Sequence, residues 1–220
     1  MMIAIHAGHT LAEYRQQYAQ VATLRPERCP RCGAVGHMTG HGGYPRRKPL
    51  DATSAPPQPV QVRRWFCTVC RRTTSLLPDL FHRHRHYLWA VIGAALVRRF
   101  VLGQTWKQIQ AALSQMPAEV DPAPSLDSLQ RWCKAYATQA HTWLQAVLVV
   151  LATVRPQWVG FNAHGTAADA PPVQLLRAMA VLAAWLGSVP GTPDSTAPPT
   201  VEALRAVWRW GWNQGLGRLT

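Results

Sequence analysis

The sequence predicts an α+β protein that is mostly α-helical, in which a small β-ribbon zinc module precedes a helix-turn-helix-like helical bundle. Two Cys-x-x-Cys pairs lie 34 residues apart in a Gly- and Arg-rich segment, and apolar residues recur at helical spacing beyond it. Stretches rich in proline separate the helical parts. We expect four parts: an N-terminal helix (1–24), a zinc ribbon (25–80), a helix-turn-helix-like domain (85–155) and a helical tail with a Pro-rich linker (156–220).

The charge distribution favours a polyanionic partner. The 220 residues carry a formal net charge of +13 although only 15% of them are charged, so the surplus arises from a shortage of acids. Between Arg25 and Arg99, 14 lysines and arginines face three acidic residues. Such a cluster attracts DNA, RNA or anionic lipid. A solvated basic face of no particular function would have the same composition.

Neither a secretory signal nor a stretch of about 20 apolar residues is recognisable in the chain. We therefore expect a cytoplasmic protein without a membrane partner. Thiols stay reduced in that compartment, so paired cysteines indicate metal binding in preference to disulfides.

The first helix and the ribbon have local signals. Thr10 and Glu13 have the spacing of a capping box, and Pro26 ends the helix that they open. Val60–Phe66 has the β-branched and aromatic composition of a strand, for which Thr39–Lys48 is a weakly marked partner.

Helices are predicted from residue 87 onward. Tyr87–Leu102 is apolar on nearly all sides and should be buried. Thr105 and Gln108 form a second capping box, which opens a helix with one apolar face. Ser125 is a good N-cap for a helix reaching Tyr136. The remaining predicted helices cover about 139–154, Val173–Leu186 and Thr200–Trp212.

Four cysteines are predicted to form a structural metal site. Cys29, Cys32, Cys67 and Cys70 would supply four thiolates, which satisfy one Zn²⁺ tetrahedrally and leave no open position for catalysis. Gly33 lets the backbone continue past the metal with a positive φ.

Other interpretations of these residues stay open. A redox dithiol or a mononuclear iron site of rubredoxin type would use the same cysteines. A histidine could replace a thiolate, although four cysteines already complete the site; the nearby candidates are His37, His41, His82, His84 and His86. The fifth cysteine, Cys133, lies on an apolar helix face and is expected to be a small core residue.

Basic residues around the cysteines are expected to contact phosphates. These are Arg46, Arg47, Lys48, Arg63, Arg64, Arg71 and Arg72.

A base-reading helix is predicted to begin at Ser125, within the order helix, loop, helix that a helix-turn-helix has. With Leu126, Leu129, Cys133 and Tyr136 facing inward, the outward residues are Asp127, Ser128, Arg131 and Lys134. Arginine can bond guanine bidentately and aspartate can accept from cytosine. The loop of about 11 residues is longer than this motif normally has, and an ordinary pair of amphipathic helices would look the same.

The chain contains five motifs in the following order: Cys29-Pro-Arg-Cys-Gly33, His41-Gly-Gly-Tyr-Pro-Arg-Arg47, Val62-Arg-Arg-Trp-Phe-Cys-Thr-Val-Cys-Arg-Arg-Thr-Thr74, Leu76-Leu-Pro-Asp79 and Ser128-Leu-Gln-Arg-Trp132. Over about residues 25–137 this arrangement resembles the zinc-ribbon and helix-turn-helix head of bacterial insertion-sequence transposases. It is also similar to uncharacterised bacterial zinc-ribbon proteins related to them. The resemblance implies a module that docks on DNA, with the ends of a mobile element as one target.

The chain departs from such transposases after this head, where they carry an RNase H-like domain with three metal-binding carboxylates. Only Asp169, Asp194 and Glu202 remain beyond residue 134, and the segment is too short for that domain. We therefore expect a detached DNA-recognition head or regulator without enzymatic activity or small-molecule substrate. The alternative is an adaptor that docks a transposase or polymerase subunit through the ribbon and a Trp-rich tail (Trp208, Trp210, Trp212).

Overall fold

The structure is a computed structural model that describes residues 2–6, 10–51, 58–81, 87–115, 124–154, 170–186, 200–214 and 216. The predicted fold class is confirmed, because a four-stranded mixed sheet is combined with a larger helical part. The chain divides into two compact units, one built on the chain up to Trp89 and the other on the chain from Ala90 onward. Each unit is described by itself.

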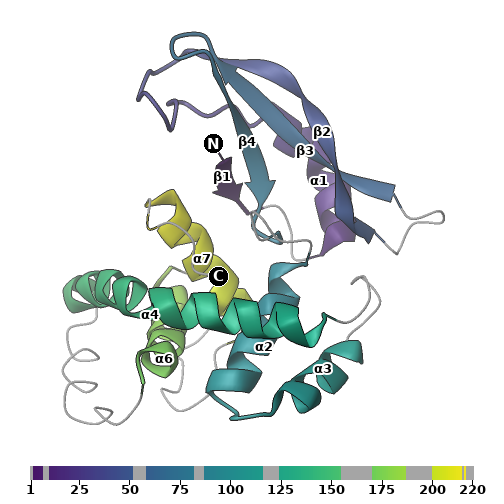
Figure 1. Cartoon of the computed structure of the whole chain (residues 1–220). Coiled ribbons are helices and arrows are strands. Elements are labelled where there is room, and N and C mark those ends of the chain that lie inside the picture. The colour runs from purple at the N-terminus through teal and green to yellow at the C-terminus, as the bar shows by residue number, and fades with distance from the viewer. Residues whose placement is uncertain are drawn as a thin grey trace. The chain divides into compact units, whose positions relative to one another are not determined.

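The first unit is a mixed sheet with one helix, drawn from purple to blue in Figure 1. Its strands lie in the order β1-β4-β3-β2, in which β1 runs parallel to β4 and the other neighbours are antiparallel. The elements are β1 (Met2–Ile5), α1 (Leu11–Thr23), β2 (Met38–Asp51), β3 (Gln58–Cys67) and β4 (Arg72–Pro78).

Strands β2 and β3 confirm the predicted ribbon, whereas β1 and β4 were not predicted. β1 has only four residues, and its pairing of Met2 with Ser75 joins segments far apart in the chain. The periodicity of apolar residues within a short window cannot predict a pairing between such distant segments.

The sheet is bulged where glycines lie on β2. Gly40 pairs with Trp65 and Gly43 with Arg63, so β2 has one residue more than β3 between these pairs. Gly42 has φ 66° at this point, a conformation that glycine adopts without steric cost. Along β3 the buried side chains change parity between Val62 and Trp65, so β3 contributes core residues to both sheet faces.

Helix α1 packs against β3. Thr10 caps it, since its hydroxyl oxygen accepts the Glu13 N–H at 3.1 Å. The Tyr14 hydroxyl donates to the Gln61 carbonyl at 2.6 Å, and its ring meets Phe81 edge to face. This contact fixes the helix on the sheet, and burial raises the pKa of Tyr14 well above its ordinary value.

The second unit is a helical bundle, drawn from teal to yellow in Figure 1. α4 packs against both α3 and α6, and α7 packs against α6. The helices are α2 (Trp89–Phe100), α3 (Trp106–Ser114), α4 (Leu126–Val154), α6 (Pro171–Trp185) and α7 (Val201–Asn213).

The prediction of two separate helices over 125–136 and 139–154 is wrong, because both segments belong to α4, a single helix of 29 residues. No glycine or proline interrupts the stretch, and buried residues continue at helical spacing through Tyr136, Ala140 and Trp143. By length and composition alone α4 could cross a membrane, because an 18-residue window within it has a mean hydropathy of 1.2, a value that core helices of soluble proteins also reach.

The predicted helix starts are largely confirmed. Thr105 and Gln108 make the complete capping box of α3, and Thr200 caps α7 by accepting the Ala203 N–H at 3.2 Å. α6 begins two residues before the predicted Val173, because proline at the first helical positions lacks only an N–H that has no helical partner there.

Candidate metal centre

The four predicted cysteines converge at one end of the first unit. Their sulfur atoms all lie within 4.8 Å of one another, close enough to hold a single metal ion. Cys29 Sγ lies 3.8 Å from Cys70 Sγ, and Cys32 Sγ lies 3.7 Å from Cys67 Sγ. In a tetrahedron with metal–sulfur bonds of about 2.3 Å, the sulfur–sulfur edge is about 3.75 Å. Two of the sulfur–sulfur distances therefore match the edge of a tetrahedral four-thiolate site, and the remaining sulfurs lie within 4.8 Å of one another.

The first cysteine pair lies in a tight hairpin. Gly33 N–H donates to the Cys29 carbonyl at 2.9 Å, and Cys29 N–H donates to the Ala34 carbonyl at 2.8 Å. Arg28 and Val35 continue the hairpin as an antiparallel bridge. Gly33 has φ 75°, which confirms the predicted positive φ.

The second cysteine pair forms the turn between β3 and β4, where Cys67 pairs with Arg72. Arg71, which follows the second cysteine of this pair as Gly33 follows that of the first, has φ 54°. The two turns are thus built alike, but the left-handed position holds a glycine in one and an arginine in the other.

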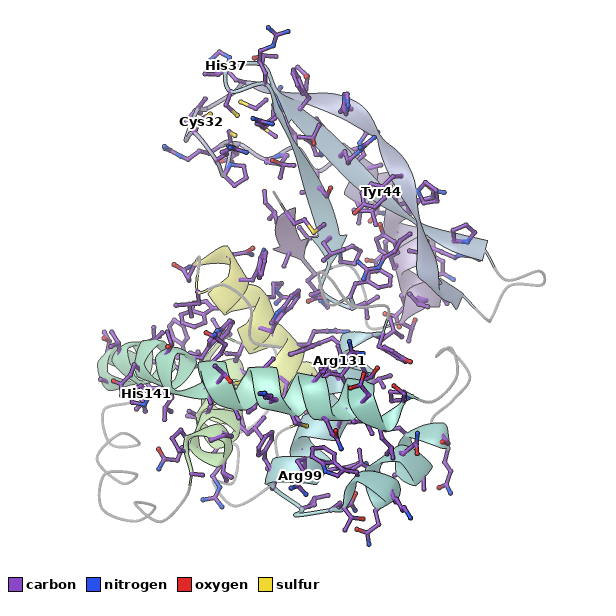
Figure 2. All side chains as sticks on the ribbon, in the orientation of Figure 1. Cys32, His37, Tyr44, Arg99, Arg131 and His141 are labelled. Carbon is purple, nitrogen blue, oxygen red and sulfur yellow. The ribbon has the colours of Figure 1, made fainter. Side chains whose placement is uncertain are left out.

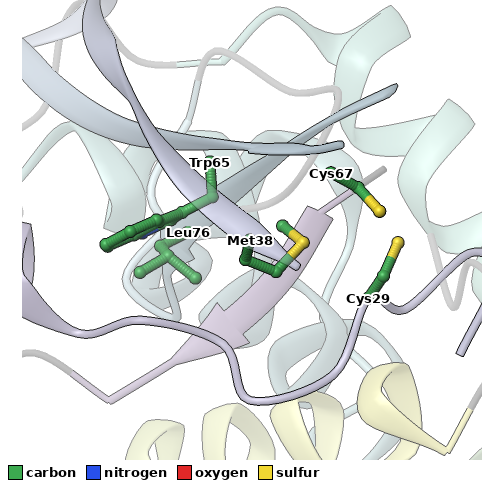
Figure 3. Close-up of a cluster of buried hydrophobic side chains, with 5 residues drawn as sticks. All are labelled: Cys29, Met38, Trp65, Cys67 and Leu76. Carbon is green, nitrogen blue, oxygen red and sulfur yellow. The ribbon is translucent and has the colours of Figure 1, made fainter. Parts of the chain in front are cut away.

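The centre is continuous with the hydrophobic core of the sheet. Cys29 and Cys67 are buried together with Met38, Trp65 and Leu76 (Figure 3). Cys70 is partly buried and Cys32 is exposed. An ion held here would fasten both cysteine turns to this core, which is the role of a structural site.

The environment stabilises thiolate at one corner of the cluster. Burial raises the pKa of Cys29. Hydrogen bonds from the backbone of Cys32 and Arg31 and from neighbouring thiols lower this pKa by a larger amount, so that it falls to about 7. Burial and hydrogen bonding with the other thiols raise the pKa of Cys70 to about 12. A central cation would deprotonate all four sulfurs.

Among the described residues, no histidine belongs to this cluster. His37 contacts the second cysteine turn through its backbone, because its carbonyl accepts the Thr68 N–H at 3.0 Å. The His41 ring lies 5.7 Å from that of Phe66. The other candidate histidines, His82, His84 and His86, lie outside the described residues.

Three arginines predicted to contact phosphate lie against aromatic rings. The guanidinium groups of Arg46, Arg63 and Arg64 lie 4.9, 5.3 and 5.5 Å from the ring centres of Phe81, Trp65 and Tyr44, respectively. Burial lowers the pKa of Arg46 from its ordinary value. Because these side chains cover rings in the fold, part of their role is structural.

Arg63 also explains a glycine on the neighbouring strand. A Cβ atom at Gly40 would lie 2.8 Å from Arg63 Nη2, so the absence of a side chain there leaves room for the guanidinium beside β2. The side chains of Arg47 and Lys48, also predicted to contact phosphate, lie outside the part of the structure that is described.

Exposed arginines surround the cysteine turns. Arg71 and Arg72 were predicted, and Arg31, in the first turn, was missed as a site residue; all three are exposed. Within the described part of the chain no hydrogen bond or ion pair occupies their guanidinium groups. Arg25 and Arg28 are also exposed, but each donates to a carbonyl of the first hairpin, that of Gly36 and Gly33 respectively. The Cys-x-x-Cys motif with arginine inside or after it was the sequence signal for this set.

The predicted base-reading residues begin helix α4 of the second unit. Asp127, Arg131 and Lys134 are exposed, and Ser128 is half-buried. Arg131, labelled on α4 in Figure 2, places its Nη2 3.0 Å from Asp127 Oδ2, and the same nitrogen donates to Ser128 Oγ at 3.4 Å. Three of these four residues therefore form one local network, which Lys134 does not join.

The inward face of this helix is as predicted. Leu129, Cys133 and Tyr136 are buried, and Leu126 is half-buried. Burial raises the pKa of the Cys133 thiol to about 12, although Arg99 acts in the opposite direction. Cys133 is therefore a core residue.

The tail tryptophans are covered to different degrees within the fold. Trp208 is buried and its ring lies 6.1 Å from that of Trp212, while Trp210 and Trp212 are half-buried. α7 thus uses much of its aromatic surface within the fold.

One comparison with known proteins covers both the cysteine turns and the start of α4. Residues 29–132 match the model of a family described as a domain of unknown function (DUF6431). The match begins at the first cysteine of the centre and ends at Trp132, near the Asp127–Arg131 pair, and it includes just under half of the chain. No curated protein and no solved structure matches the chain significantly.

Proposed function

We propose that the chain is a zinc-dependent DNA-binding protein in which the cysteine turns hold one structural Zn²⁺ and present arginines to the phosphate backbone. Zinc fits the donor set, because it accepts four thiolates at the sulfur spacing seen here. Iron in a rubredoxin-like site has the same geometry, so metal analysis must separate the two.

The observation that carries the proposal is the set of unoccupied arginines beside the metal centre. Residues 25–37 and 67–72 contain five arginines and one glutamate, a surplus of four positive charges. A zinc ion with four thiolates carries two negative charges, so compensation of the metal centre accounts for only half of this surplus. The remaining charge, and guanidinium groups without an acidic partner in the described residues, fit a polyanion.

The test measures binding to a labelled random-sequence duplex as a function of salt. The logarithm of the association constant falls with log salt, and each phosphate contact makes this slope steeper by about 0.9. Replacing Arg31, Arg71 and Arg72 by alanine should therefore reduce the magnitude of the slope by up to about 2.7. A matched control changes the net charge equally at exposed positions of α1, through Gln16→Glu, Gln17→Glu and Gln20→Glu.

The control should retain a steeper salt dependence than the arginine variant. Equal slopes for the two variants would show that only net charge matters, and an unchanged slope in the arginine variant would remove the cysteine turns from the interface. Chelation of the metal should abolish binding, since folding of such a site is coupled to its ion.

We further propose that the protein acts as a DNA-recognition head or regulator of a bacterial mobile element, in the cytoplasm. The role is supported by the order of the sequence motifs along the chain, which resembles that of the heads of insertion-sequence transposases. Recovery of bound genomic fragments would test it, because element ends should be enriched among them. Fragments with no relation to mobile elements would contradict the role but leave DNA binding intact.

An adaptor that docks a transposase or polymerase subunit is the second candidate. Exposed valines on both cysteine turns favour it, because Val35 and Val69 are 59% and 56% exposed, respectively. The charge around them favours nucleic acid. Replacing both valines by serine should leave DNA affinity nearly unchanged, whereas an adaptor would lose its partner protein.

A further inference from the structure

The first turns of α4 contain a network of polar and charged side chains, and a hydrogen bond from α3 holds the residue that precedes it. Gln110 of α3 donates from Nε2 to the Pro124 carbonyl at 3.0 Å. Ser125 then caps α4, since its hydroxyl oxygen accepts the Ser128 N–H at 3.2 Å while it donates to Ser128 Oγ at 3.1 Å. Arg131 Nη2 donates to that same Ser128 oxygen. The position of Arg131 is thereby tied to the backbone at the junction of the two helices.

Asp127 holds the guanidinium from the other side. Its Oδ2 lies 3.0 Å from Arg131 Nη2, within the range of a charge-assisted hydrogen bond. The two residues are four apart, with the acid nearer the helix N-terminus, which is the favourable orientation for an ion pair on a helix. Arg131 and Asp127 are 61% and 74% exposed, so the pair is presented to solvent and is not needed to cover the core.

We propose that Asp127 is a positioning residue, which orients Arg131 to read a single guanine in the major groove and makes no base contact of its own. This inference rests on the proposed DNA-binding function. It replaces the expectation that Asp127 accepts a hydrogen bond from cytosine, because the Oδ2 atom of this carboxylate already pairs with Arg131.

The donors that remain on Arg131 match guanine. A guanidinium has five N–H donors, and Asp127 occupies one hydrogen of Nη2. The contact to Ser128, at 3.4 Å, is at the long end for a hydrogen bond and is easily exchanged for a better acceptor. The end-on pair Nη1 and Nη2 can then donate to O6 and N7 of guanine. Fixing this long side chain beforehand reduces the rotamer entropy lost on binding.

The experiment is a binding-site selection from a random duplex pool, using wild type, Asp127→Ala, Arg131→Ala, the double variant and the control Gln130→Ala. Gln130 is an exposed neighbour on the same helix. Arg131→Ala should reduce the preference for one guanine by about 5- to 150-fold, the value of a bidentate contact. Asp127→Ala should weaken the preference at that same position by about 1.4- to 2.3-fold, the contribution of an exposed pair at this spacing, and Gln130→Ala should leave it unchanged.

The double variant decides between positioning and direct reading. If Asp127 acts through Arg131, the double variant should match Arg131→Ala alone. A change of preference at a different base pair in Asp127→Ala, or effects that add in the double variant, would show that Asp127 contacts a base and would overturn the proposal. An unchanged motif in Asp127→Ala, with only a lower melting temperature, would reduce the pair to a stabiliser of the helix. If wild type enriches no sequence and does not bind duplex DNA at all, the proposed function falls together with this inference.

Discussion

Replacing Arg71 by glycine should stabilise the protein, although it removes a residue beside the metal centre. Among the described residues, Arg71 alone combines a side chain with a positive φ, at 54°. In the left-handed region the Cβ atom of an L residue crowds the following carbonyl oxygen, at a cost of about 1–2 kcal/mol. The first cysteine turn avoids this cost, because Gly33 occupies the equivalent position with φ 75°.

The expected gain is smaller than the strain itself. Glycine loses more conformational freedom on folding than other residues, which offsets about 0.5–1 kcal/mol. Taking the middle of both ranges, the net effect of Arg71→Gly is an increase of about 0.75 kcal/mol in the free energy of unfolding. For a chain of this length, 1 kcal/mol corresponds to a rise of about 2–4 °C in melting temperature.

Two variants with the same charge change serve as controls. Arg71→Ala retains the left-handed strain and should be close to wild type in stability. Arg72→Gly lies in strand β4 and should lose about 0.5–1 kcal/mol, because glycine weakens a strand. Denaturant unfolding with zinc in excess measures all three. An Arg71→Gly variant no more stable than Arg71→Ala would refute the reasoning from backbone strain.

Three further predictions concern the metal, the helical packing and pH. Metal analysis should find about one zinc per chain with four sulfurs at about 2.3 Å by X-ray absorption, and Cys67→Ser should lower the metal content; full retention would remove Cys67 from the ligand set. Gly211→Ala should destabilise the second unit by about 1–3 kcal/mol despite alanine's higher helix propensity, because its Cβ would lie 2.5 Å from Trp143 Cη2; a stability gain in thermal unfolding would show that Trp143 moves aside freely. Burial raises the pKa of Cys133 from 9.0 to about 12, so its contribution to stability is complete below pH 9 and should be lost as the pH rises toward 12, by up to about 1.4 kcal/mol per pH unit; unfolding free energies of Cys133→Ala that fall with pH as steeply as those of wild type would contradict this.

The convergence of the four candidate ligands could be predicted from sequence because much of the information is local. A Cys-x-x-Cys turn brings its two sulfurs together without help from the rest of the fold, and only the meeting of the two turns is long-range. The caps Thr10, Thr105 and Thr200 were equally predictable, since each accepts an N–H only three residues away. The inward positions Leu129, Cys133 and Tyr136 followed from helical spacing.

Only the tertiary structure showed the features that depend on contacts between distant parts of the chain. The pairing of β1 with β4 joins segments more than 70 residues apart. The uninterrupted length of α4 depends on continued packing, through residues such as Trp143. The roles of the arginines also separated only in three dimensions. Arg46, Arg63 and Arg64 resemble Arg71 and Arg72 in sequence, yet the first three lie over aromatic rings and the last two lie open at the metal centre. The physical reason is that ring stacking and exposure depend on which strands become neighbours, whereas turns, caps and thiolate pairs depend on residues a few positions apart.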